Sequence, residues 1–97
     1  MKSPLLAIAL AFFMFTAFEA QAQDGAALTT SKGCVGCHAV AQKKVGPAFK
    51  DVAVKYAGKA DAGATISAKL KSGQGHPKVA ASDAELKSMV DYVLAVK

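Results

Sequence analysis

The chain is 97 residues long and carries a formal net charge of +5 at pH 7, and every basic side chain except histidine is a lysine. Without arginine it has no planar fork for base edges or paired phosphates, which argues against a nucleic-acid partner. The lysines either keep the surface soluble or steer the protein towards an acidic partner. A chain this short forms one small domain with a thin core, which often needs a disulfide, a metal or another staple.

The first 22 residues have the features of an export signal. A short basic start at Lys2 precedes an apolar run over residues 5–18, and Ala20-Gln21-Ala22 fits the A-x-A cleavage pattern. The run is shorter than the ~20 apolar residues that cross a bilayer. We therefore predict a cleaved signal peptide over 1–22 and a periplasmic domain over 23–97 with no membrane contact after cleavage. An uncleaved tether would leave the same domain outside the cytoplasmic membrane.

The rest of the chain predicts an all-α domain, because no stretch alternates in the manner of a strand. Helices are expected over residues 25–32, 49–56 and 62–71, with a last helix that begins at Ser82. Asp24 is the expected N-cap of the first helix. The last helix has the clearest signal, because Ser82 and Glu85 fit a capping box. The apolar stripe of that helix comprises Leu86, Met89, Val90, Val93 and Leu94.

The segment Cys34-Val35-Gly36-Cys37-His38 has the C-x-x-C-H pattern of a c-type haem attachment site. Two thiols at this spacing can bond to the two vinyl groups of one porphyrin, and the following histidine then lies under the iron. We predict one haem c, covalently attached through Cys34 and Cys37, with His38 as an axial ligand.

The two cysteines allow three other interpretations. A C-x-x-C disulfide would close a very small loop and stabilise little. A thioredoxin-like redox pair needs a preceding strand, and none is predicted. A zinc site could draw on Cys34, Cys37, His38 and His76, but neighbours such as Cys37 and His38 rarely converge on one tetrahedral centre. Haem attachment uses the same residues without this conflict.

Three segments of the chain resemble small bacterial class I cytochromes c. Residues 32–40 resemble the haem-binding segment of that family, residues 45–53 the segment after it, and residues 82–93 the C-terminal helix. This resemblance implies about four short helices wrapped around one haem. It also implies that the Pro47 carbonyl accepts a hydrogen bond from Nδ1 of His38, and that Tyr92 packs on the N-terminal helix. The haem pocket, or the core behind it, would include Leu28, Phe49, Leu70 and Met89.

The chain departs from this family at the sixth iron ligand, which is usually a methionine followed by proline before the last helix. Here His76-Pro77 stands in that place, in a loop that looks shortened, whereas Met89 lies on the core stripe of the last helix. We therefore predict that His38 and His76 both bind the iron. Lys78, or an open or water-bound sixth site, is the alternative. Imidazole favours ferric iron more than a thioether does, so the potential should be low.

No catalytic set of residues is evident, so the leading functional prediction is a one-electron carrier and not an enzyme. Its partners would be redox proteins, with an acidic docking surface facing lysines such as Lys43, Lys44 and Lys78. Two alternatives stay open. The protein could bind or sense a small ligand that displaces His76, or it could be the haem subunit of an oxidoreductase complex.

Overall fold

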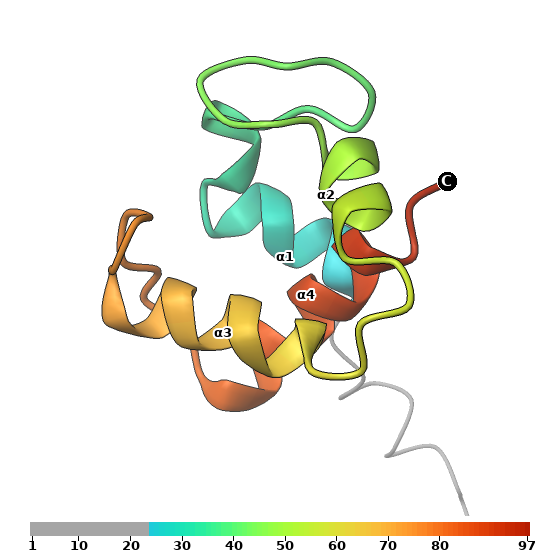
Figure 1. Cartoon of the computed structure of the whole chain (residues 1–97). Coiled ribbons are helices and arrows are strands. Elements are labelled where there is room, and N and C mark those ends of the chain that lie inside the picture. Colours follow the sequence, from blue (N-terminus) through green and yellow to red (C-terminus); the bar gives the residue numbers. More distant parts are fainter. Residues whose placement is uncertain (1–23) are drawn as a thin grey trace, which may run out of the picture.

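The computed structural model describes residues 24–97, which form four α-helices and one 3₁₀ turn (Figure 1). In chain order these are α1 Gly25–Ser31, η2 Cys34–Gly36, α2 Phe49–Lys55, α3 Ala62–Ser72 and α4 Asp83–Leu94. Residues 24–97 contain no strand, so the all-α prediction is confirmed. The first three predicted helices agree with the observed ones to within one residue at each end, and the last begins within one residue of its predicted start. The 3₁₀ turn was not predicted. The predicted signal peptide lies outside the described residues.

The fold is organised around α4, which packs against α1, α2 and α3. In Figure 1, α1 and α4 lie in the middle, with α2 above them and α3 below. The crossing of α1 and α4 is close because Gly25 has no side chain: a Cβ at this position would collide with the Ser88 carbonyl and with Cβ of Tyr92. The expected packing of Tyr92 on the N-terminal helix is therefore confirmed. Within residues 24–97, no helix is long and apolar enough to cross a membrane.

Side-chain caps begin both α1 and α4, as the sequence predicts. The carboxylate of Asp24 accepts a hydrogen bond from the Ala26 amide at 3.0 Å. At the start of α4 the capping box is complete: the Glu85 amide donates to Oγ of Ser82 at 3.1 Å, and the Ser82 amide donates to Oε1 of Glu85 at 2.9 Å. These bonds satisfy amides that have no partner inside the helix, which fixes where each helix begins.

The apolar core is thin, because three of its members are alanines. Its centre is a cluster of Leu28, Leu86 and Met89, against which Leu70 and Val79 pack. The buried hydrophobic residues are Leu28, Ala48, Phe49, Ala53, Ala62, Leu86, Met89 and Val90. Met89 is only 2% exposed, which confirms that it is a core residue of α4. A fully buried large side chain contributes about 1.5–3 kcal/mol, so few such contributions hold this fold together.

Glu85 should make the stability of the protein depend on acid pH. The pKa of its carboxyl is lowered, mainly by the hydrogen bond from the Ser82 amide and also by Lys32, whose Nζ lies 3.5 Å away. A carboxyl whose pKa is lower in the folded than in the unfolded protein stabilises the fold at pH values above its unfolded pKa of about 4.3. This stabilisation is lost as the pH falls through the folded pKa.

Glu85→Gln should therefore lose less stability than the parent protein between about pH 5 and pH 3, as measured by thermal unfolding. Asp91→Asn is a suitable control, because Asp91 forms an exposed ion pair with Lys87 and caps no helix. An acid dependence in Glu85→Gln equal to that of the parent would contradict this assignment.

Candidate functional site

The two cysteines lie at the ends of the 3₁₀ turn that follows α1. The chain turns at Gly33, whose φ of 84° is readily adopted only by glycine, and η2 then spans Cys34–Gly36. The amides of Cys37 and His38 both donate to the Cys34 carbonyl, at 3.1 and 3.0 Å. Both thiols are free, so the alternative of a disulfide is not observed. Cys34 is half-buried against the core, and this burial raises the pKa of its thiol, whereas Cys37 is exposed.

His38 is held in one orientation by the segment that precedes α2. Its Nδ1–H donates to the Pro47 carbonyl at 2.7 Å, which confirms the bond that the family resemblance implies. The ring lies over Phe49, with centroids 5.4 Å apart and an interplanar angle of 22°. Gly46 lets the backbone lie close to the His38 ring, because a Cβ at this position would collide with Cε1 of the imidazole. Since a carbonyl only accepts, this bond leaves Nε2 as the ring nitrogen available to a metal.

The loop between His38 and α2 folds back onto the cysteine turn. The Gly46 amide donates to the Cys37 carbonyl at 2.7 Å, and Nζ of Lys44 donates to the Val35 carbonyl at 2.9 Å. The second bond was not foreseen, because a lysine in a loop carries no sequence signal of an internal partner. Together the two bonds fix the position of the cysteine turn relative to the His38 imidazole.

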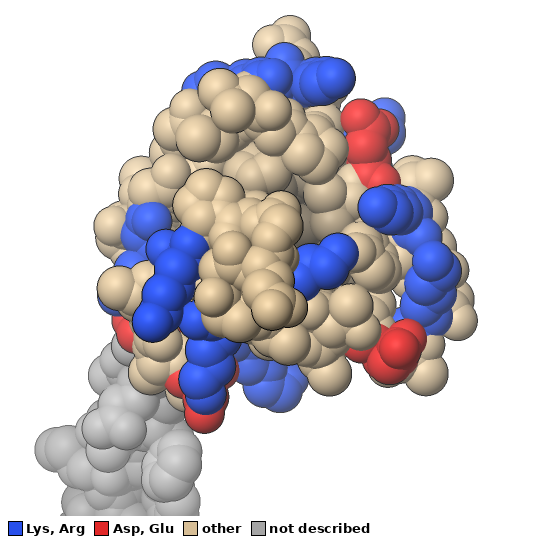
Figure 2. Space-filling view, turned by 60° about the vertical axis from the view of Figure 1, so that its left-hand side comes forward, with Lys and Arg blue, Asp and Glu red and all other residues tan. Residues whose placement is uncertain are grey.

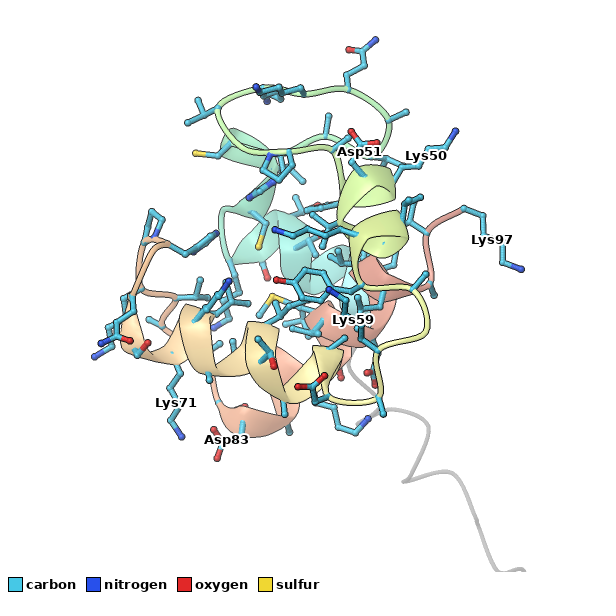
Figure 3. All side chains as sticks on the ribbon, in the orientation of Figure 1. Lys50, Asp51, Lys59, Lys71, Asp83 and Lys97 are labelled. Atoms are coloured by element: carbon cyan, nitrogen blue, oxygen red, sulfur yellow. The ribbon has the colours of Figure 1, made fainter. Side chains whose placement is uncertain are left out.

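His76 lies in the loop that joins α3 to α4. Gly73 and Gly75 have φ values of 78° and 71°, and they turn the chain on either side of Gln74. The base of the loop is closed by a hydrogen bond of 2.8 Å from the Val79 amide to the Leu70 carbonyl. Lys71 and Asp83, which face each other in Figure 3, add an ion pair of 2.9 Å across the ends of the loop. That pair is exposed and contributes little on its own.

The His76 imidazole has the same kind of partner as His38. Its Nδ1–H donates to the carbonyl of Pro77 at 2.7 Å, which leaves Nε2 available. This bond between neighbouring residues was not predicted from the sequence.

The fold brings the two histidines together. The ring centroids of His38 and His76 are 6.0 Å apart and their planes differ by 9°. When two imidazoles bind one metal, each metal–nitrogen bond is about 2 Å long, as is known for zinc. These two bonds and the distance from each nitrogen to the centre of its ring add up to roughly the observed centroid separation. The separation of the two rings therefore matches that of two imidazoles on one metal, an arrangement in which each Nε2 points at the metal within its ring plane. Among residues 24–97 there is no group of three or more histidine, cysteine or acidic side chains of the kind that zinc uses.

The surface near the cysteine turn is basic and partly apolar. Residues 25–50 include no acidic side chain, whereas Lys43, Lys44 and Lys50 are exposed. Three exposed valines lie in the same part of the chain: Val35, Val40 and Val45. The loop after α3 lies at the left of Figure 1, and Figure 2, which turns that side forward, shows lysines spread over the surface with few carboxylates among them.

Known proteins are similar to this chain over most of its length. A family model described as "Cytochrome c" matches residues 22–97. The chain is 42% identical over 104 residues to cytochrome c-551 of Pseudomonas aeruginosa, with 100% of both chains covered. It is 40% identical over 84 residues to cytochrome c-552 of Nitrosomonas europaea, which covers 78% of this chain and 82% of that protein.

Two solved structures are similar to the whole helical domain. The structure of wild-type Nitrosomonas europaea cytochrome c552 has a TM-score of 0.66 and 38% identity, covering 74% of this chain and 99% of that one. The class 1 cytochrome MtoD from Sideroxydans lithotrophicus ES-1 has a TM-score of 0.64 and 34% identity, covering 74% and 91%. The alignment with the Pseudomonas protein has 104 positions, seven more than this chain has residues.

Proposed function

The chain belongs to the cytochrome c family, and we propose that it is a periplasmic one-electron carrier with a low-potential haem bound by two histidines. The family binds one haem c, covalently attached through cysteines, and the homologues of this chain are electron-transfer cytochromes c and not enzymes. The bound haem supplies a one-electron ferric/ferrous couple. The polypeptide attaches the haem, supplies its axial ligands and presents a surface to its partners.

In this proposal Cys34 and Cys37 form the thioether bonds, and His38 and His76 are the axial ligands. The observation that carries it is the pairing of the two imidazoles, 6.0 Å apart and 9° from parallel, each with Nδ1–H bonded to a proline carbonyl. Met89 does not compete as a ligand because it is buried in the core of α4. Imidazole stabilises ferric iron more than a thioether does, which accounts for the low potential.

We also propose that residues 1–22 are a cleaved signal peptide and that residues 23–97 are the exported domain. The basic start, the apolar run and the A-x-A site support this proposal, and the family match begins at residue 22. The partners are redox proteins with an acidic docking surface. The support is the absence of acidic side chains between residues 25 and 50, where Lys43 and Lys44 are exposed.

A second candidate, a small-ligand binder or sensor, is favoured by one observation. His76 lies in a short loop, and its only side-chain hydrogen bond within residues 24–97 is to its own neighbour, Pro77. An incoming ligand would then have to displace a histidine whose side-chain hydrogen bond is purely local.

Absorption spectra of the haem-loaded protein test the proposal. A bis-histidine carrier should be six-coordinate and low-spin in both oxidation states, without a sulfur-to-iron charge-transfer band, and its reduced form should not bind carbon monoxide rapidly at neutral pH. A charge-transfer band or a high-spin ferric spectrum would exclude the two-histidine site. Rapid and complete binding of carbon monoxide would favour the sensor.

A further inference from the structure

Both imidazoles of the site donate to a proline carbonyl, but the two prolines differ in their distance along the chain from the histidine. His38 donates to Pro47, nine residues away in the chain, and His76 donates to Pro77, the next residue, both at 2.7 Å. We propose that the Pro77 carbonyl is a positioning group for His76: it fixes the Nδ1–H tautomer and keeps the ring nearly parallel to that of His38. This inference rests on the bis-histidine function proposed above.

The tautomer follows from the chemistry of the bond. A carbonyl oxygen only accepts hydrogen bonds, so the proton of a neutral His76 ring must be on Nδ1, and the lone pair is on Nε2. A hydrogen bond of this kind also makes an imidazole a stronger donor to a metal, which stabilises the ferric state. The Pro77 bond thus adds to the lowering of the potential that imidazole ligation itself produces.

The backbone explains why a proline is suited to this position. The pyrrolidine ring fixes φ of Pro77 near −65°, so the direction of its carbonyl has only one soft dihedral left. On the other side of His76, Gly75 has a φ of 71°, which lets the loop turn tightly before the histidine. The turn at Gly75 and the fixed φ of Pro77 together place the Pro77 carbonyl oxygen 2.7 Å from Nδ1 of His76.

The orientation of the rings has an electronic consequence. With the planes 9° apart, two imidazoles bound to one iron would donate π density along one direction, which would separate the iron d orbitals strongly. Parallel ligand planes therefore give a rhombic ferric spectrum in electron paramagnetic resonance, with three resolved g values. Perpendicular planes give one dominant signal at a much higher g value.

The test compares the ferric parent protein with Pro77→Gly, which frees the backbone dihedral, and with Gln74→Ala as a control in the same loop. The parent and the control should give the rhombic spectrum. Pro77→Gly should broaden it or shift it towards the high-g form, and it should raise the midpoint potential. Exogenous imidazole should displace His76 at roughly tenfold lower concentration, the lower end of the loss seen when such supporting bonds are removed.

A second variant covers the case in which Pro77→Gly fails to fold. Nδ1-methylhistidine at position 76 keeps Nε2 but cannot donate to Pro77, so it should show the same changes without altering the loop sequence. The inference is overturned if both variants stay low-spin and bis-histidine with the parent's g values, potential and imidazole affinity. A parent protein that is high-spin or methionine-ligated would instead refute the proposed function, and this inference with it.

Discussion

His76→Met should raise the midpoint potential of the haem by about 0.1–0.3 V, a fraction of the roughly 0.8 V range that axial ligands span. The thioether stabilises ferrous iron, whereas the imidazole that it replaces stabilises ferric iron. A methionine side chain is long and flexible enough to reach a site that a histidine reaches from the same Cα. A redox titration measures the shift, and a new sulfur-to-iron charge-transfer band in the ferric protein shows that the methionine is bound.

Gln74→Met is the matched control, because it adds a methionine to the same exposed loop and leaves His76 in place. Its potential and spectrum should equal those of the parent. His76→Ala completes the set, since it should open the sixth site and let the reduced protein bind carbon monoxide rapidly. If His76→Met keeps the parent's potential and His76→Ala stays six-coordinate without added ligand, then His76 does not bind the iron.

The helices of this protein could be predicted because their limits are set by neighbouring residues. The bonds of Asp24 to Ala26 and of Ser82 to Glu85 span two or three positions, so the sequence itself contains both partners. The bond between His38 and Pro47 spans nine positions and was expected only through the resemblance to a family. The caps can thus be predicted without knowledge of the fold, whereas the bond that supports His38 cannot.

Other features depend on tertiary contacts that no local pattern records. Gly25 looks like an ordinary helix start, but it allows α1 to cross α4 against Ser88 and Tyr92. Lys44 is an exposed loop lysine, but its Nζ also donates a hydrogen bond to the Val35 carbonyl. The near-parallel arrangement of the two imidazoles also depends on tertiary contacts, because it arises only when two loops from distant parts of the chain meet.

Gly46→Ala should be the most damaging single-methyl change near the site. Its Cβ would collide with Cε1 of the His38 ring, so the imidazole must move and its 2.7 Å bond to Pro47 is strained or lost. Overpacking of this kind costs about 1–3 kcal/mol and a lost hydrogen bond about 0.5–1.5 kcal/mol. Together they should lower the thermal midpoint of the haem-loaded protein by roughly 6–36 °C for a domain of this size.

Gly36→Ala provides the control within the cysteine motif, because a Cβ there has no neighbouring atom within 4 Å. It should change stability by less than about 0.5 kcal/mol, as open surface substitutions do. The two variants add the same methyl group ten residues apart, so a difference between them isolates the contact with His38. A ferric spectrum of Gly46→Ala with weakened low-spin character would show that the shift reaches the iron. Equal thermal midpoints and equal spectra would mean that the close approach of Gly46 to the imidazole does not constrain the site.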